Sequence, residues 1–300
     1  MTDSMLIADS GSTKTTWMEV ESGNMIVTEG LNPHFTSEEQ FMAACKQVTA
    51  SPLPLSQGEG ICLQPASASP LLGRGAGVRL YFYGAGCGLP AQCNKVASWL
   101  AKAFGTSDVH VETDMLAACR ATAGDQPALV GILGTGSNAC YYDGRQIAYQ
   151  APSTGYILGD EGSANHVGRR LLQDYLSGCM PRNISSRFHD AYPMTREEFL
   201  DAVYHQPNAN RFLASLARFA VEHINDDYCS SEILFSLEEW YNYQLDHLLK
   251  ISHCMALYLV GGFAARIKTL IEPVARNHGL EIKGVLADPI EGLRQYIKKI

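Results

Sequence analysis

Short apolar segments separated by polar turns open the chain. "MLIAD" (5–9), "TTWMEV" (15–20) and "MIVTEG" (25–30) have the length and composition of β-strands. They are separated by "SGSTK" and "ESGN", which are rich in turn residues. The pattern therefore predicts a β-meander over the first 30 residues.

A helix, a strand and further elements are predicted after the meander. Helical spacing runs through 37–50 with Ser37 as the cap, and "GVRLYFYGAG" returns to strand. A helix over about 90–104 is followed by the short strand "VHVET" and by a helix that opens near Asp114. Residues 51–77 contain four prolines with several glycines and serines, so we expect an irregular insertion outside the core.

The opening pattern recurs in the middle of the chain. Residues 128–150 again place an apolar strand before a Gly/Ser/Thr turn, then a second strand, an Asp-Gly turn and a third strand. The Gly-Ser pairs of the two copies fall at 11–12 and 136–137. This repetition predicts a duplicated α/β fold of two lobes around a central cleft, to which each lobe contributes one hairpin loop.

The rest of the second half sets the expected domain boundaries. It is mostly helical over about 161–250, returns to strand at "ALYLVGG", forms a helix over about 264–277 and ends with the strand "GVLAD" and a helix from Pro289. We expect an N-terminal lobe of residues 1–118 and a C-terminal lobe of residues 119–288. The final helix, 289–300, is expected to pack back on the first lobe.

Charge and composition exclude several classes of partner. The formal net charge is -8, and no block of lysine and arginine occurs, so we expect no nucleic-acid partner. The sequence shows no basic segment followed by an apolar h-region and no apolar run of bilayer length. We therefore expect a cytoplasmic protein without a membrane partner.

Nine cysteines and nine histidines raise the question of a metal or disulfide framework. The cysteines include no CxxC and no paired spacing, so we expect buried, reduced thiols. The histidines form no HExxH or other close ligand pair, so no zinc site is expected.

The Gly-rich loops depart from two common nucleotide-binding fingerprints. Lys14 and Thr15 match the end of a Walker A loop, but Ala8 and Thr13 stand where that loop needs glycine. "YGAGCGL" follows a strand, but Leu89 stands where a dinucleotide fingerprint requires glycine or alanine. What remains is two hairpin turns whose N–H groups and hydroxyls could hold a polyphosphate from two sides, although each alone could be only a turn.

Five motifs taken together resemble a known superfamily. "IADSGSTKT", "VETDMLAACRA", "GILGTGSNACYYDG", "GDEGSA" and "LYLVGGFA" occur in this order. The set resembles the actin-like ATPase and sugar kinase superfamily, with its duplicated ribonuclease H-like fold. Within it, the chain is similar to the BadF/BadG/BcrA/BcrD-type ATPase family, on the branch that contains N-acetylglucosamine kinases. The resemblance covers nearly the whole chain apart from residues 51–77.

The resemblance implies a nucleotide site and the cofactors ATP and Mg²⁺. The residues implied to bind the ATP phosphates are Asp9, Gly11, Ser12, Thr13, Lys14, Gly134, Thr135 and Gly136. Asp9 is also implied to reach magnesium through water, although by itself it could merely cap the turn. Gly261 and Gly262 are implied to form the adenosine loop, with a tight strand-to-helix turn as the alternative.

Asp114 is the catalytic base by similarity. Phosphoryl transfer needs mainly alignment and charge neutralisation, so this carboxylate need not have a raised pKa. Its position after "VHVET" leaves helix N-capping as the alternative interpretation.

The acceptor side depends on "GLNPHF", "GTGSN" and "STGYILGDEG". The residues implied to bind the sugar, besides Asp114, are Asn32, Ser137, Asn138, Gly155, Tyr156 and Asp160. Asn32 could also be only a turn residue, and Asp160 fits the start of a helix equally well. Animal N-acetylglucosamine kinases carry Gly-Gly-Trp-Gly before Gly-Asp-Glu-Gly, whereas this chain has Thr154 to Ile157 there, which leaves N-acetylmuramic acid open as the acceptor.

The sequence therefore predicts an ATP-dependent kinase that phosphorylates a hydroxyl of an N-acetylated amino sugar, with N-acetylglucosamine as the first candidate. The alternatives are an ATPase that activates a dehydratase or reductase through an iron-sulfur cluster, and a sugar sensor without turnover. We expect a homodimer with a small-molecule sugar substrate.

Overall fold

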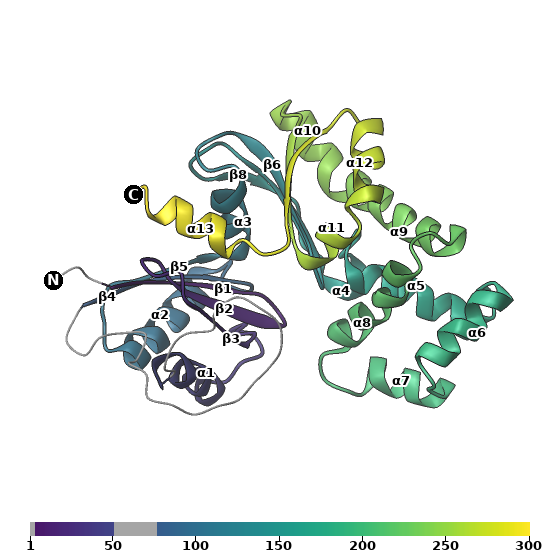
Figure 1. The fold of residues 1–300 in the computed structure, drawn as a ribbon, viewed down its shortest axis with the longest axis horizontal. Helices are drawn as coiled ribbons and strands as arrows, with labels where there is room; N and C mark the ends of the chain where they lie inside the picture. The colour runs from purple at the N-terminus through teal and green to yellow at the C-terminus, as the bar shows by residue number, and fades with distance from the viewer. Residues whose placement is uncertain (1–3, 51–76) are drawn as a thin grey trace. The chain divides into compact units, whose positions relative to one another are not determined.

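The computed structural model describes residues 4–50 and 77–300, so the predicted insertion lies outside the described residues except for Gly77. The chain divides into two compact units (Figure 1). Unit 1 comprises the described residues up to Ala121 together with Pro289–Ile300, and unit 2 comprises Thr122–Asp288. Each unit is built around one five-stranded sheet.

The sheet of unit 1 contains the predicted meander. Its strands are β1 (Ser4–Ser10), β2 (Lys14–Glu19), β3 (Met25–Glu29), β4 (Val78–Gly84) and β5 (Val109–Thr113). They lie in the order β3-β2-β1-β4-β5, with β1, β2 and β3 antiparallel and β4 and β5 parallel to β1. The first loop and the carboxyl ends of β4 and β5 therefore meet at one end of the sheet.

Helices cover both faces of this sheet because β1 is apolar on both sides. The helices are α1 (Glu38–Ala50), α2 (Pro90–Phe104), α3 (Asp114–Thr122) and α13 (Ile290–Ile297). Leu6 and Ala8 belong to the core cluster of α1 and α2, whereas Ile7 packs with Ala117 of α3 and Leu293 of α13. Alternate residues of a strand point to opposite faces, so one strand serves both layers.

The sheet of unit 2 repeats this topology. Its strands are β6 (Ala128–Leu133), β7 (Ser137–Tyr142), β8 (Ile147–Gln150), β9 (Ala256–Val260) and β10 (Glu281–Leu286). The order β10-β9-β6-β7-β8 matches that of unit 1 strand for strand, with the meander β6-β7-β8 in the place of β1-β2-β3. The predicted duplicated α/β fold is confirmed.

Unit 2 carries most of the helices. They are α4 (Gly155–Leu158), α5 (Ala164–Ser177), α6 (Arg182–Ala191), α7 (Arg196–Tyr204), α8 (Ala209–Glu222), α9 (Asp227–Trp240), the π-helix η1 (Tyr241–Leu245), α10 (Asp246–Ser252), α11 (Gly262–Arg266) and α12 (Lys268–Asn277). The single helix predicted over 264–277 is wrong, because the chain leaves helical geometry at Ile267 (φ -105°, ψ 16°). The Ile267 side chain is fully buried in the unit 2 core.

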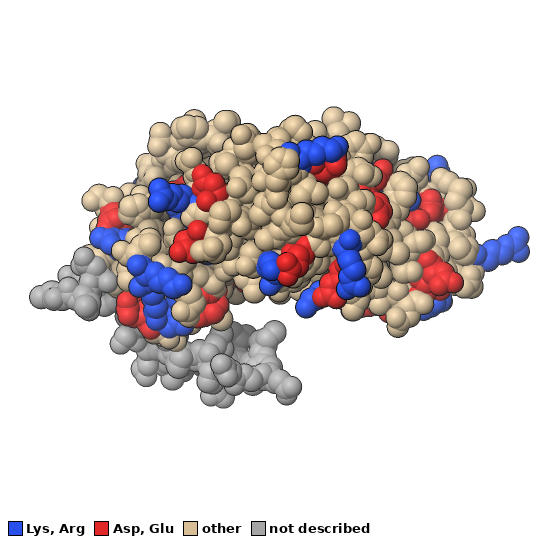
Figure 2. Space-filling model, turned by 90° about the horizontal axis from the view of Figure 1, so that it is seen from above, with Lys and Arg blue, Asp and Glu red and all other residues tan. Residues whose placement is uncertain are grey.

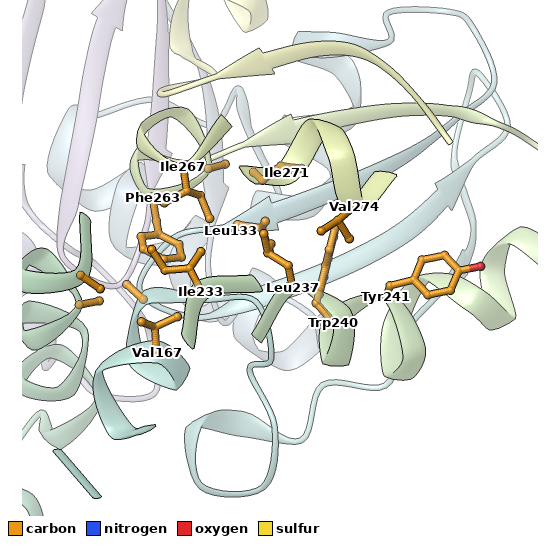
Figure 3. Packing of buried hydrophobic residues seen from close by; sticks show 14 of the residues in the cluster. Leu133, Val167, Ile233, Leu237, Trp240, Tyr241, Phe263, Ile267, Ile271 and Val274 are labelled. Atoms are coloured by element: carbon orange, nitrogen blue, oxygen red, sulfur yellow. The ribbon is translucent and has the colours of Figure 1, made fainter. Parts of the chain in front are cut away.

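The core of unit 2 supports the end of strand β6 (Figure 3). Leu133, the last residue of β6, is fully buried in one cluster with Ile233 and Leu237 of α9 and Phe263 of α11. The loop that follows Leu133 therefore starts from a fixed point of the core.

The surface shows no segregation of charge on the face drawn in Figure 2, where lysine and arginine side chains are interspersed with aspartate and glutamate. Over residues 4–50 and 77–300, no helix combines the length and the apolar character needed to cross a membrane.

Candidate active site

Loop 1, residues 10–15, is a tight turn between β1 and β2. The Gly11 N–H donates to the Lys14 carbonyl oxygen at 3.0 Å, and the buried Ser10 and Thr15 hydroxyls at the two ends are 2.8 Å apart. Thr13 at the tip and Lys14 at the start of β2 are exposed. The loop is therefore fixed at its base, and its polar tip is exposed to solvent.

Gly30 supports loop 1 from behind. Its N–H donates to the Thr13 carbonyl oxygen at 3.1 Å, and a Cβ at residue 30 would lie 2.5 Å from the Gly11 carbonyl oxygen. The next N–H, that of Leu31, donates to the Ser10 hydroxyl at 3.0 Å. Gly30 was not predicted as a site residue, although it directly precedes Leu31 and Asn32 in "GLNPHF".

Asp9 is a half-buried carboxylate at the carboxyl end of β1, between the buried residues Ala8 and Ser10. Magnesium is commonly bound by one or two carboxylates together with phosphate oxygens and waters, so a single aspartate beside loop 1 suits this ion. Within residues 4–50 and 77–300, no group of three or more histidine, cysteine, aspartate or glutamate side chains could hold a metal.

Asn32 forms an Asx turn in which its side chain is only partly used. Its Oδ1 accepts the N–H of His34 at 3.0 Å, and Lys95 of α2 donates to the Pro33 carbonyl oxygen at 3.0 Å. A Cβ at Gly86, where φ is +86°, would lie 2.5 Å from the Asn32 Oδ1. Asn32 is thus a turn residue whose Oδ1 is used, while its Nδ2 donors make no hydrogen bond to the described residues.

Asp114 lies in the same part of unit 1. Asp114 directly follows Thr113, whose partner in the sheet is Gly84, and Gly84 in turn pairs with Ser10 at the end of β1. Gly86, two residues after Gly84, closely approaches the Asn32 side chain. Unit 1 thus brings Asn32 and Asp114 to one loop, residues 84–88, that sequence reasoning had set aside.

The N-cap interpretation of Asp114 is wrong. The cap of α3 is Thr113, whose hydroxyl accepts the N–H of Leu116 at 3.1 Å, whereas Asp114 Oδ1 accepts the N–H of the adjacent Met115 at 2.9 Å. Burial raises the pKa of Asp114, against the hydrogen bonds from Met115 and from its own backbone. A carboxylate with a raised pKa is a better proton acceptor than an ordinary one.

Loop 2, residues 134–136, connects β6 with β7, as loop 1 connects β1 with β2. The Gly134 N–H donates to the Gly136 carbonyl oxygen at 2.9 Å. The carbonyl oxygens of Gly134 and Thr135 accept the N–H groups of Ala164 (2.9 Å) and Asn165 (3.0 Å) at the start of α5. Helix α5 therefore determines the orientation of the loop 2 backbone.

Asp160 contacts loop 2 directly. A Cβ at Gly136 would lie 2.7 Å from the Asp160 Oδ2, which accepts a hydrogen bond from Asn165 Nδ2 at 2.7 Å. Burial raises the pKa of Asp160, while hydrogen bonds from Asn165 and the Ser137 N–H and the charge of Arg169 lower it. The carboxylate is thus held on several sides.

The helix-start interpretation of Asp160 is wrong. Its φ is +58°, outside helical geometry, and α5 begins at Ala164 with Ser163 as the N-cap. Aspartate tolerates this left-handed conformation in turns, so Asp160 is a turn residue between α4 and α5.

Ser137 and Asn138 differ in what their side chains can reach. The Ser137 hydroxyl is buried and accepts a hydrogen bond from Gln244 Nε2 at 2.9 Å, so its side chain is used inside the unit. Asn138 is half-buried, and its Oδ1 accepts the Ala139 N–H at 2.9 Å. The predicted sugar contact of the Ser137 side chain therefore depends on the hydrogen of this hydroxyl.

Gln244 is a residue that sequence reasoning missed. It lies in the π-helix η1, a rare element that is frequent at functional sites. Its Nε2 also donates to Glu161 Oε2 at 3.2 Å, so one amide connects the end of loop 2 with the segment that carries Asp160. No local pattern could have identified it, because Gln244 and Ser137 are 107 residues apart.

His166 and Ser236 form a second support for this segment. The Ser236 Oγ accepts the Gly162 N–H at 2.9 Å and lies 2.8 Å from His166 Nδ1, and His166 Nε2 lies 3.3 Å from Glu239. Because the Ser236 Oγ accepts a hydrogen bond from Gly162, we assign the Ser236 hydroxyl as the donor and His166 Nδ1 as the acceptor of the bond between them. Burial, aided by the charges of two arginines, lowers the pKa of His166 to about 4. The imidazole is thus neutral at pH 7.

The two predicted adenosine glycines differ in their surroundings. A Cβ at Gly261, where φ is +135°, would lie 2.2 Å from the Leu133 carbonyl oxygen, whereas a Cβ at Gly262 would meet nothing within 4 Å. Gly261 is thus required for packing against the start of loop 2, and Gly262 leaves open space for a ligand. Gly155 and Tyr156 form the first turn of α4, just before Asp160.

Comparisons with known proteins support this architecture. No protein-family model and no curated protein matches the chain. A proposed N-acetylglucosamine kinase of Porphyromonas gingivalis has 30% sequence identity and a TM-score of 0.83, over 98% of this chain and 99% of that chain. A second such protein, of Chromobacterium violaceum, has 17% identity and a TM-score of 0.69, over 98% and 99%.

A more distant structure shares the fold. The ROK family glucokinase of Streptomyces griseus, in complex with glucose and AMPPNP, has 14% identity and a TM-score of 0.56, over 99% of this chain and 98% of that chain. The two repeated sheets together with these likenesses define the class. The chain belongs to the actin-like ATPase and sugar kinase superfamily.

Proposed function

We propose that this protein is an ATP-dependent kinase that transfers the γ-phosphoryl group of ATP to a hydroxyl of an N-acetylated amino sugar. N-acetylglucosamine is the first acceptor to test, and N-acetylmuramic acid is the alternative. We place the chain on the N-acetylglucosamine kinase branch of the BadF/BadG/BcrA/BcrD-type ATPases. The observation that carries the proposal is Asp114, whose pKa is raised by burial, in the same unit as loop 1 and Asn32. The likeness to the Porphyromonas gingivalis protein supports the acceptor class.

The nucleotide is bound mainly by backbone groups in this proposal. The phosphate-binding residues are Asp9, Gly11, Ser12, Thr13, Lys14, Gly134, Thr135 and Gly136. Gly262, with open space above its Cα, accepts the adenosine, and Gly261 keeps loop 2 in place. Magnesium, when bound with ATP near Asp9, neutralises phosphate charge.

In this proposal the acceptor sugar is recognised by polar side chains. Asn32 offers its amide N–H groups, Asp160 accepts hydroxyl hydrogens, and Asn138 contributes a further amide. As the acceptor oxygen bonds to the γ-phosphorus, its proton moves to Asp114, the bond from the γ-phosphorus to the bridging oxygen breaks, and ADP leaves. The Ser137 hydroxyl accepts from Gln244 and donates its own hydrogen to the acceptor sugar.

The test is acceptor-dependent ADP release. Purified protein is assayed with N-acetylglucosamine, N-acetylmuramic acid, N-acetylmannosamine and glucose, alongside Asp114→Asn and the control Asp190→Asn, which alters an exposed aspartate of α6. We expect one N-acetylated sugar to raise ADP release strongly in the parent and the control and not in Asp114→Asn. ADP release that no sugar increases would contradict the kinase proposal and favour an activating ATPase. We also propose a homodimer, which light scattering would show as twice the chain mass.

A further inference from the structure

Unit 2 contains a cavity of about 620 Å³ between helices α4, α5, α7 and α8. This volume is in the range of small-molecule sites. The apolar part of its wall is formed by Ile157, Leu172, Leu176, Leu200, Val203 and Leu213. None of these six residues is among the proposed nucleotide or acceptor ligands. Tyr156, which the resemblance implies for the acceptor, also lines the cavity, so the cavity adjoins the predicted acceptor residues and extends away from them.

Two arginines are the only charged residues of the cavity wall, Arg169 of α5 and Arg196 of α7. Arg169 Nη1 donates to the carbonyl oxygens of Tyr156 and Ile157, and Arg196 Nη1 donates to the Leu176 carbonyl oxygen at 3.2 Å. Within residues 4–50 and 77–300, neither guanidinium forms an ion pair with a carboxylate. The cavity is therefore apolar and positively charged.

The arrangement suits an anion better than a neutral or cationic molecule. A guanidinium has five N–H donors in a planar fork that matches a carboxylate, and the bonds above use only one nitrogen of each arginine. Arg196 also lies in the first turn of α7, where the helix dipole disfavours a cation. Helix stability therefore does not explain the presence of Arg196.

We propose that this cavity binds a small organic anion in which a carboxylate is carried on an apolar body. The apolar body packs against the leucines, and the carboxylate pairs with Arg169 and Arg196. The anion has two possible sources, a separate molecule or a carboxylate substituent on the acceptor sugar. Binding itself does not depend on the proposed kinase function, and only the second source rests on it.

Arg169 connects the cavity with Asp160. Its Nη1 binds the α4 backbone directly before the Asp160 segment, and its charge acts on the Asp160 carboxylate. An anion paired with Arg169 would weaken that action and loosen or reorient the contact with α4. Occupancy of the cavity should therefore alter the affinity for any ligand that Asp160 binds.

The test uses two fluorescent probes with the same apolar body. 8-Anilinonaphthalene-1-sulfonate carries an anionic group, and N-phenyl-1-naphthylamine does not. Both are titrated into the parent, Arg196→Gln, Leu200→Trp and the control Arg145→Gln, which removes an exposed cation of the β7-β8 turn. Circular dichroism and thermal melting verify that each variant is folded.

We expect the sulfonate probe to bind with 1:1 stoichiometry and to lose about tenfold in affinity in Arg196→Gln, as for the loss of one charge-assisted hydrogen bond. Leu200→Trp should weaken both probes by filling the cavity, and Arg145→Gln should change neither. Equal affinity of Arg196→Gln and the parent for the sulfonate probe, or equal binding of both probes by the parent, would overturn the proposal.

Displacement of the sulfonate probe distinguishes the two sources. Octanoate should displace it and octanol should not, and displacement by octanol alone would overturn the proposal. Displacement by N-acetylmuramic acid but not by N-acetylglucosamine assigns the carboxylate to the acceptor, whereas displacement by octanoate alone assigns it to a separate molecule. Sugar kinase activity without probe binding at this cavity would reject the inference and leave the proposed function intact.

Discussion

Gly136 approaches Asp160 so closely that a Cβ on residue 136 would lie 2.7 Å from the Asp160 Oδ2. That oxygen also accepts a hydrogen bond from Asn165 Nδ2, so it moves aside only at the expense of this bond. The absence of a side chain at residue 136 thus determines where the Asp160 carboxylate lies.

Gly136→Ala should therefore impair acceptor binding more than folding. We expect the KM for the acceptor to rise by about tenfold or more, because displaced polar groups lose their partners. Steady-state kinetics with the acceptor varied at saturating ATP measures this change. Asp190→Asn, at an exposed aspartate of α6, is the control. An unchanged acceptor KM in Gly136→Ala would argue against Asp160 as an acceptor ligand.

Asp114→Asn should reduce kcat while leaving the protein at least as stable as the parent. Loss of a general base costs about 10²- to 10⁴-fold in rate. Burial raises the pKa of Asp114, so its ionised form is unfavourable in the folded protein, and a neutral amide removes this cost. Thermal melting at pH 7 alongside the ADP assay measures both effects. A large loss of stability would indicate that Asp114 is structural.

The same raised pKa predicts the acid limb of the activity profile. The base must be ionised to accept a proton, so kcat/KM should rise with pH through the pKa of Asp114, above the ordinary value of an aspartate. The measurement is kcat/KM between pH 4 and pH 8, over the part of this range in which the parent stays folded, with Asp190→Asn as the control. A profile without an acid limb would contradict the role of Asp114.

His166 should make the protein sensitive to mild acid. Its pKa is lowered from 6.5 to about 4 on folding, so the unfolded chain binds more protons between these values. This contribution to stability is present above pH 6.5 and is lost as the pH falls toward 4, up to about 3 kcal/mol. Urea denaturation at several pH values measures it. His166→Gln should show a smaller loss over this range, and the exposed-site control His205→Gln should behave like the parent.

Substitutions of Gly261 and Gly262 should have different effects, the first on stability and the second on ATP binding. Gly261→Ala places a Cβ 2.2 Å from a backbone oxygen at a φ of +135°, so we expect a loss of about 3 kcal/mol or more, seen as a lower melting temperature. Gly262→Ala should leave the melting temperature of the ligand-free protein near that of the parent and weaken ATP binding in calorimetry. Normal ATP affinity in a folded Gly262→Ala would exclude this glycine from the adenosine site.

The corrected interpretations share one physical origin. The sequence around Asp114 and Asp160 permits a capping or helix-start role, and only the hydrogen bonds of Thr113 and Ser163 show which residues cap the helices. Ile267 separates α11 from α12, because its N–H donates to the carbonyl oxygen of Phe263 in the first helix and its carbonyl oxygen accepts the N–H groups of Leu270 and Ile271 at the start of the second. Which of several neighbouring polar residues caps a helix, and where a predicted helix is interrupted, depends on tertiary packing rather than on the local sequence pattern.

The sequence alone determined the strands, most helices, the two hairpin loops and the repeat that joins them, because these depend on side-chain periodicity and turn residues within a few positions. Tertiary structure decided what holds the loops in place. Gln244 forms a hydrogen bond with Ser137 across a separation of 107 residues, and Ser236 forms one with Gly162 across 74 residues. Neither hydrogen bond can be predicted from the residues next to its partners. Long-range contacts form between surfaces that only the folded chain brings together, so the environment of Asp160 could be read only from the structure.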